Sequence, residues 1–140
     1  MLAGTRPPSW SFNPHIILSE PKKKILCVED HADMCELITI DLPEYEVIGA
    51  YSKADALNQA TADQFDLYLL DYYLPDGTGL ELCLLIRAFD PDTPIFFCSG
   101  SDSLTIEQIE KTGGQRFIYK NETFLWKLRE AVTEVLSQQE

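Results

Sequence analysis

Five short apolar runs recur between residues 25 and 119, and each is followed by a segment with helix signals. The runs cover residues 25–28, 46–50, 66–70, 95–98 and 116–119. Runs of four or five residues that are largely apolar are typical of strands buried on both faces. Their strict alternation with helices predicts an α/β fold, a doubly wound parallel sheet of five strands with helices on both faces.

The segments between the runs carry the start and stop signals of helices. We expect helices over residues 33–42, from Ser52 onward, and over 80–89, 103–111 and 122–137. Pro43 ends the first of them, and Ser52 with Asp55 resembles a capping box at the start of the second. Gly113 and Gly114 are natural terminators for the fourth.

Residues 1–21 precede this pattern and contain four prolines and little periodicity. We expect a flexible N-terminal tail over residues 1–21 and one domain over residues 22–140. Trp10, Phe12 and the apolar run 16–18 are unusual for a purely disordered tail. Packing of the tail on the domain or on a partner therefore stays open.

The composition excludes several classes of protein. A formal net charge of −12 argues against direct nucleic-acid binding, which needs a cationic surface. The one basic run, residues 22–24, is typical of a solvated charged segment before a buried strand. No segment approaches the roughly 20 apolar residues of a membrane span, and the N-terminus lacks the features of a signal peptide.

The four cysteines, Cys27, Cys35, Cys83 and Cys98, form no C-x-x-C pair and have no zinc-ligand spacing. Cys27 and Cys98 lie in apolar runs, where cysteine behaves as a small hydrophobic residue. We therefore expect a cytoplasmic protein with reduced thiols.

Polar side chains follow the expected strands at the points where the strands end. Glu29 and Asp30 follow the first strand, Asp71 the third, Ser99 the fourth and Lys120 the fifth. Since the carboxyl ends of parallel strands meet at one edge of the sheet, these side chains should converge. Crowded carboxylates repel one another, and a hard divalent cation such as Mg²⁺ relieves that repulsion.

This set of side chains suits phosphoryl transfer to a carboxylate. Asp71, at the centre, is the natural nucleophile and would form an acyl phosphate. Lys120 and the Ser99 hydroxyl would stabilise the phosphoryl oxygens. Each residue alone has a simpler interpretation, as a turn former, a helix cap or a solvated charge, and only their joint occurrence favours the functional one.

From Lys24 to about Ser137, the chain resembles the receiver domain of bacterial two-component response regulators. The resemblance rests on the motifs at residues 25–30, 70–79, 97–100 and 117–120. It implies a flavodoxin-like, three-layer (βα)5 fold with the strand order 2-1-3-4-5.

The resemblance also implies roles for individual residues. Asp71 would be the phosphorylation site. Asp30 would bind Mg²⁺ directly, Glu29 through water, and the backbone carbonyl of Tyr73 would be a third protein ligand.

The resemblance implies a switch as well. Lys120 would pair with the phosphoryl group, Ser99 would be the switch hydroxyl, and Phe117 would turn inward when Ser99 moves. Pro75 and Gly79 match the usual loop after the acceptor.

Two positions depart from the family pattern. Asn121 stands where the family usually has proline after the lysine, which leaves the geometry of that loop undetermined. Tyr73 places a bulky ring two residues beyond the acceptor. We hypothesise that this ring shields the acyl phosphate from water.

By this resemblance the chain is a signalling phospho-acceptor rather than a conventional enzyme, with Mg²⁺-dependent autophosphorylation and autodephosphorylation. Because the sequence ends at Glu140, directly after the last expected helix, we expect the receiver to stand alone. A sensor histidine kinase or a histidine phosphotransfer protein would phosphorylate it. A downstream protein would then read a surface around the fourth and fifth helices. The same helices could form a homodimer.

Three alternatives share parts of this pattern. An aspartate-nucleophile phosphatase would need a second acid at the position of Tyr73. A flavodoxin-like cofactor binder would need a phosphate-binding loop where the acidic Glu29, Asp30 and His31 stand. The third alternative is a receiver-like module that only docks partners.

Overall fold

The computed structural model describes residues 21–100 and 104–137. Its main sheet contains β1 (Lys24–Val28), β2 (Glu46–Ala50), β3 (Leu67–Asp71), β6 (Ile95–Ser99) and β7 (Arg116–Tyr119). These strands are parallel and lie in the order β2-β1-β3-β6-β7. Counted along the chain, this is the expected order 2-1-3-4-5, so the predicted doubly wound sheet is confirmed.

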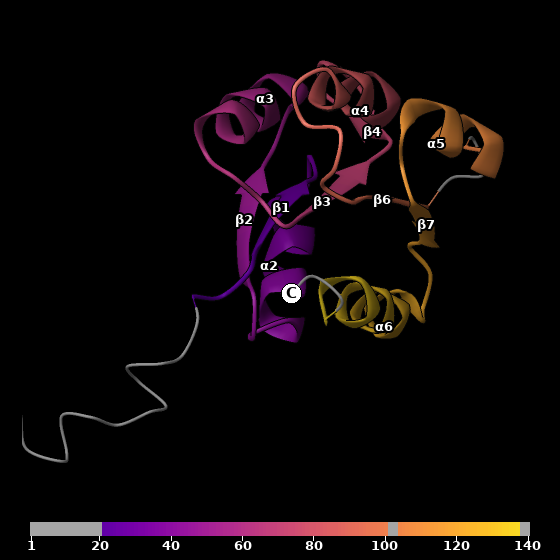
Figure 1. The fold of residues 1–140 in the computed structure, drawn as a ribbon. Helices are drawn as coiled ribbons and strands as arrows, with labels where there is room; N and C mark the ends of the chain where they lie inside the picture. The colour runs from indigo at the N-terminus through magenta and orange to yellow at the C-terminus, as the bar shows by residue number, and fades with distance from the viewer. Residues whose placement is uncertain (1–20, 101–103, 138–140) are drawn as a thin grey trace, which may run out of the picture.

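Helices cover both faces of the sheet (Figure 1). They are α2 (Ala32–Asp41), α3 (Lys53–Ala62), α4 (Gly79–Arg87), α5 (Ile106–Thr112) and α6 (Phe124–Ser137). α3, α4 and α5 share one buried cluster with the sheet, and α2 and α6 share the other. The result is the expected three-layer architecture.

Alternating strand residues supply these two clusters. In β1, Leu26 and Val28 point to the α3–α4–α5 side, whereas Ile25 and Cys27 point to the α2–α6 side. All five residues of β3 are buried, which explains why its sequence is almost uninterruptedly apolar. The four cysteines are buried and free, as expected of small hydrophobic residues.

Side-chain caps fix where several helices begin. The Ser52 hydroxyl accepts a hydrogen bond from the Asp55 amide, so the cap suggested by the sequence forms. The helix expected over residues 103–111 begins instead at Ile106, because Thr105 and Gln108 form a capping box there. Gly113 has φ 96° in the left-handed region and ends α5, as its sequence predicts.

A small antiparallel hairpin follows β3 and was not expected from the sequence. It pairs β4 (Tyr73–Leu74) with β5 (Gly77–Thr78). The carboxylate of Asp76, at its turn, accepts hydrogen bonds from the amides of Lys53 and Ala54. The hairpin therefore anchors the loop after β3 to the start of α3.

Residues 1–20 lie outside the described part of the chain, so the expectation of an N-terminal tail stays a prediction. Among the helices of residues 21–100 and 104–137, none has the length and apolar character needed to cross a bilayer.

Candidate functional site

The carboxyl edge of the sheet gathers three carboxylates and one ammonium group. Glu29 follows β1, Asp71 ends β3 and Lys120 follows β7. One carboxylate oxygen from each of Glu29, Asp30 and Asp71 lies within 4.8 Å of the others. Lys120 Nζ pairs with the Glu29 carboxylate and lies 3.3 Å from Asp71 Oδ1. The strand ends thus bring together the side chains that the sequence singled out; we call Glu29, Asp30 and Asp71 the acidic cluster.

Burial makes this cluster electrostatically costly. Glu29 is only 3% exposed and Asp71 only 9%. Burial, with the charge of Asp71, raises the pKa of Glu29 to about 7, although the hydrogen bond and charge of Lys120 oppose the shift. Burial acts to lower the pKa of Lys120, but its hydrogen bond to Glu29 and the nearby carboxylate charges outweigh burial, so that pKa is raised.

The donor atoms of the cluster suit a hard cation. Glu29 Oε1 is buried and has no hydrogen-bond partner among the described residues. A buried carboxylate oxygen without a partner is unfavourable unless a cation, a water molecule or a proton satisfies it. Together with Asp30 and Asp71 it offers the all-oxygen environment that Mg²⁺ prefers.

The backbone around Asp71 is held closely. Asp71 Oδ1 accepts a hydrogen bond of 2.8 Å from the Tyr72 amide, and the Gly79 amide donates to the Tyr72 carbonyl at 2.7 Å. A Cβ atom at Gly79 would overlap the Asp71 carbonyl oxygen. Glycine at this position therefore lets α4 start directly against the end of β3. The family resemblance placed Gly79 in the usual loop after the acceptor, but did not predict its contact with Asp71 itself.

Tyr73 starts the hairpin, and its side chain is 56% exposed. Its ring packs edge-on against the Tyr72 ring, with 4.6 Å between centroids. The ring is thus close in sequence to Asp71 and open to solvent.

Ser99 and Phe117 lie near the same edge. Ser99 is buried at the end of β6, and its carbonyl accepts a 3.0 Å hydrogen bond from the Lys120 amide. Phe117 is half-buried in β7, where it pairs with Phe97 and meets the Tyr119 ring edge-on at 4.6 Å.

The loop at Asn121 is held by the asparagine side chain. Asn121 Oδ1 accepts hydrogen bonds from the amide and the hydroxyl of Thr123, at 3.1 and 2.9 Å. The peptide bonds of the described residues are all trans, including the bond between Lys120 and Asn121. Asn121 thus shapes the entry to α6 by hydrogen bonding, in place of the usual proline ring.

Sequence reasoning missed a pair of thiols behind the cluster. Cys35 of α2 and Cys27 of β1 place their Sγ atoms 3.1 Å apart. Cys98 pairs in register with Asp71, and burial raises the pKa of its thiol to about 12. These thiols form the apolar floor of the carboxyl edge. His31, with its Nε2 atom 3.7 Å from Asp30 Oδ1, is largely exposed.

Comparisons with known sequences agree with this geometry. Residues 25–133 match the family model of the response regulator receiver domain. The response regulator protein PilR of Pseudomonas aeruginosa is 35% identical over 118 residues, which are 82% of this chain and 26% of PilR. The response regulator ArlR of Staphylococcus saprophyticus is 35% identical over 82 residues, 57% of this chain and 37% of ArlR. The matched part of the chain thus spans only 26% of the length of PilR and 37% of the length of ArlR.

Solved structures share the fold. A two-component response regulator from Clostridium difficile has a TM-score of 0.77 and 25% identity, over 85% of this chain and 99% of that one. The response regulator TrrA of Thermotoga maritima, solved in complex with Mg(2+)-BeF, has a TM-score of 0.73 and 27% identity, over 81% and 98% of the two chains.

Proposed function

Because this chain belongs to the response regulator receiver family, we propose that Asp71 accepts a phosphoryl group and that the acidic cluster holds the Mg²⁺ needed for the transfer. Receiver domains are phospho-acceptors of two-component signalling rather than conventional enzymes, and they bind Mg²⁺ at an acidic pocket. The observation that carries the proposal is the meeting of three carboxylates and Lys120 around the end of β3. The Mg(2+)-BeF complex of TrrA supports it.

In the proposed reaction, an Asp71 oxygen attacks phosphorus, the bond from phosphorus to the donor breaks, and an acyl phosphate forms. Asp30 and Asp71 would hold the metal directly, Glu29 through water, and the Tyr73 carbonyl would complete the protein ligands. A bound Mg²⁺ neutralises charge on the phosphoryl oxygens. Lys120, already 3.3 Å from Asp71 Oδ1, would pair with the new group.

The donor would be a histidine kinase or a histidine phosphotransfer protein. The surface beside the cluster supports such docking, because Leu37 of α2 is half exposed. It borders a cleft of about 230 Å³ that is lined by Met34, Leu37, Lys120, Asn121, Glu122, Phe124 and Leu125. An apolar helix face next to the acceptor suits a helical partner.

The phosphorylated state would be read at the face formed by α5, β7 and α6. Ser99 would move toward the phosphoryl group, and Phe117 would turn into the space that it leaves. Ile106, Tyr119 and Trp126 expose large apolar surfaces on this face, which supports docking of a downstream protein or of a second copy. That the receiver works alone, without an attached output domain, stays a prediction.

The direct test is incubation with acetyl phosphate and Mg²⁺, followed by intact-mass measurement. We expect the mass to increase by one phosphoryl group, with the gain lost when EDTA replaces Mg²⁺ and reversed by hydroxylamine, which cleaves acyl phosphates. A chain that gains no mass here and also binds no Mg²⁺-beryllofluoride would contradict the proposal. Steady hydrolysis of a phosphomonoester would favour the phosphatase alternative instead.

Tyr73→Ala is expected to speed the loss of the phosphoryl group several-fold. The half-exposed ring stands two residues beyond Asp71 and can restrict the approach of water to the acyl phosphate. Tyr73→Phe keeps the ring and is the matched control, expected to lose phosphate at the unmodified rate. The decay of the phosphorylated mass after removal of acetyl phosphate measures both rates; equal decay in Tyr73→Ala would refute the shielding hypothesis.

A further inference from the structure

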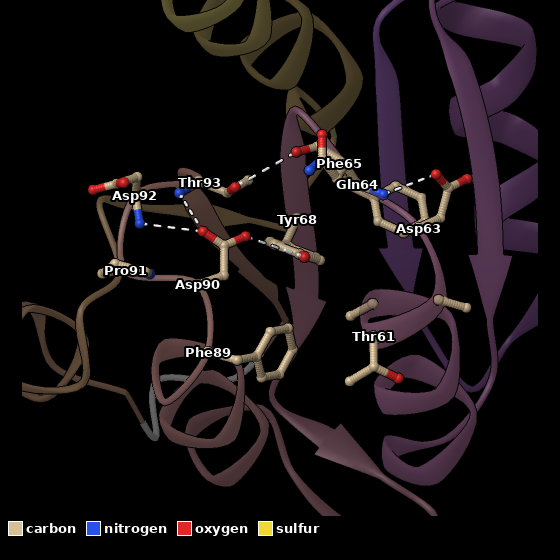
Figure 2. A pocket seen from close by; sticks show the side chains of 12 residues that line it. Thr61, Asp63, Gln64, Phe65, Tyr68, Phe89, Asp90, Pro91, Asp92 and Thr93 are labelled. Carbon is tan, nitrogen blue, oxygen red and sulfur yellow. Dashed lines mark hydrogen bonds between the residues drawn. The ribbon is translucent and has the colours of Figure 1, made fainter.

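A second hollow lies at the amino edge of the sheet, at the opposite end of β3 from the acidic cluster. This amino-edge groove has a volume of about 780 Å³ and is lined by residues 60–65, Tyr68 and residues 89–93. Figure 2 shows Phe89 and Tyr68 between the end of α3 on one side and the loop that carries Asp90 and Asp92 on the other. The proposed phosphoryl transfer uses none of these residues.

The groove combines aromatic surface with negative charge. The Phe89 side chain is 45% exposed and so presents an open aromatic face to the groove. Asp90 and Asp92 stand on one wall and no lysine or arginine is among the lining residues, whereas Asp63 on the other wall is paired with Lys24. α3 and α4 both end beside it, and the carboxyl ends of helices add partial negative charge. Its chemistry therefore suits an aromatic occupant that also carries a positive group.

The N-terminal segment joins the domain beside this groove. Lys24, the first residue of β1, pairs through Nζ with Asp63 of the groove wall, and its amide donates to Asp66 Oδ2 at 2.8 Å. Residues 1–20 therefore connect to the domain at the same edge of the sheet. A random coil with as many residues as separate Trp10 from Lys24 would have a mean span of about 20 Å, compared with a radius of gyration of about 14 Å for a domain of this size.

The composition of the segment complements the groove. Residues 1–20 contain Trp10, Phe12 and the apolar run 16–18. With His15 counted as neutral, Arg6 and Glu20 are the only charged side chains of this segment, and their charges cancel. The net charge of −12 therefore resides on the rest of the chain. An arginine and a tryptophan in one nearly neutral segment match the carboxylates and the open ring of the groove.

We propose that residues 1–20 dock in the amino-edge groove, with the Trp10 ring against Phe89 and the Arg6 guanidinium near the carboxylate of Asp92. Because the segment and the groove belong to one chain, weak contacts are sufficient to keep the segment bound. A short flexible link gives an effective concentration of about 1 mM, so an intrinsic dissociation constant near 0.1 mM would keep the segment bound about nine-tenths of the time. This docking is independent of phosphorylation at Asp71.

Tryptophan fluorescence of the full chain tests the proposal. Trp126 is the only other tryptophan, and it is 65% exposed on α6, so Trp126→Phe leaves Trp10 as the sole emitter. In this background we expect the Trp10 emission to be blue-shifted relative to that of tryptophan in water. We also expect Phe89→Ala to raise the acrylamide quenching constant about fivefold, as the bound fraction falls. Arg6→Gln should raise it about twofold, because the cationic contact is lost.

Two further variants separate docking from unfolding and from docking elsewhere. Thr61→Arg fills the groove from its exposed wall without removing a core side chain, and should raise the quenching constant as Phe89→Ala does. Ile106→Ala removes an exposed apolar side chain far from the groove and should leave it unchanged. The proposal would be overturned if the Trp126→Phe protein had the same quenching constant with and without the added Phe89→Ala or Thr61→Arg change. The proposal would also be overturned if Trp10 were protected from acrylamide at a protein concentration of about 100 μM but not at about 1 μM. The segment would then dock in the groove of a second copy.

Discussion

Replacement of Asp71 by asparagine is expected to abolish phosphoryl uptake from acetyl phosphate and, in metal-free buffer, to raise the free energy of unfolding by about 1 kcal/mol. The first effect follows because an amide oxygen cannot form the acyl phosphate. The second follows because Asp71 lies beside the buried Glu29 and the exposed Asp30, with ligand oxygens within 4.8 Å of one another. The side chain required for function is thus expected to weaken the fold.

The sign of the stability change depends on two opposing contributions. At an effective dielectric constant near 20, two charges 4 Å apart interact by about 4 kcal/mol. Above pH 7, where Glu29 carries its charge, asparagine removes two repulsions, with Glu29 and with Asp30, and one attraction, with Lys120 at 3.3 Å. The Tyr72 amide can still donate to the amide oxygen of the variant. Repulsion outweighs the lost attraction, and solvent relaxation reduces the net gain to about 1 kcal/mol.

Urea unfolding in EDTA measures this gain. Glu110→Gln removes an exposed carboxylate of α5, away from the cluster, and should change stability by less than about 0.5 kcal/mol. Mg²⁺ should reverse the order: at ten times its dissociation constant it stabilises the unmodified protein by about 1.4 kcal/mol, and the Asp71→Asn variant much less. A variant that is destabilised in EDTA would show that the Lys120 pairing dominates the cluster.

Gly79→Ala is expected to destabilise the domain by about 3 kcal/mol and to slow phosphoryl uptake at least about tenfold. The added Cβ would overlap the carbonyl oxygen of Asp71 and lie 3.3 Å from the Phe97 ring. A backbone oxygen cannot swing aside as a flexible side chain can, so the acceptor residue itself must shift. Gly79 does not have a positive φ, so alanine causes no backbone strain of its own there.

Gly100→Ala is the matched control for stability, since a Cβ at Gly100 would meet no atom within 4 Å. We expect its free energy of unfolding to stay within about 0.5 kcal/mol of the unmodified value. Urea unfolding of both variants, with the rate of mass gain in acetyl phosphate, gives the comparison. If Gly79→Ala unfolds at the same urea concentration as Gly100→Ala, the close approach of α4 to β3 does not constrain the acceptor.

Much of the fold was predictable because its signals are local. The residues of β3 are buried on both faces and therefore read as a continuous apolar run, and Ser52 and Gly113 mark helix ends by their own chemistry. The strand order came from the family resemblance, because periodicity alone does not distinguish among parallel arrangements. The two-residue strands of the β4–β5 hairpin are too short to leave a periodic pattern.

The site was predictable in its membership but not in its pairing. The ends of β1, β3 and β7 had to meet, so Glu29, Asp71 and Lys120 could be grouped from the sequence. That Lys120 pairs with the buried Glu29 carboxylate depends on side-chain positions across 91 residues of chain. The Cys27 and Cys35 thiols likewise lie 3.1 Å apart on a strand and a helix, and no rule of sequence spacing predicts this contact.

The ion pair between Lys120 and Glu29 has a consequence for how the signal would end. A phosphoryl group on Asp71 would compete with Glu29 for a single ammonium group, so the pairing is exchanged rather than added. The phosphorylated state would then be stabilised by less than the attraction between Lys120 and the phosphoryl group, because the Lys120–Glu29 pair is lost. When the phosphoryl group leaves, Lys120 can pair with Glu29 again. The Lys120–Glu29 pair would thus favour the unphosphorylated arrangement and keep the conformational change reversible.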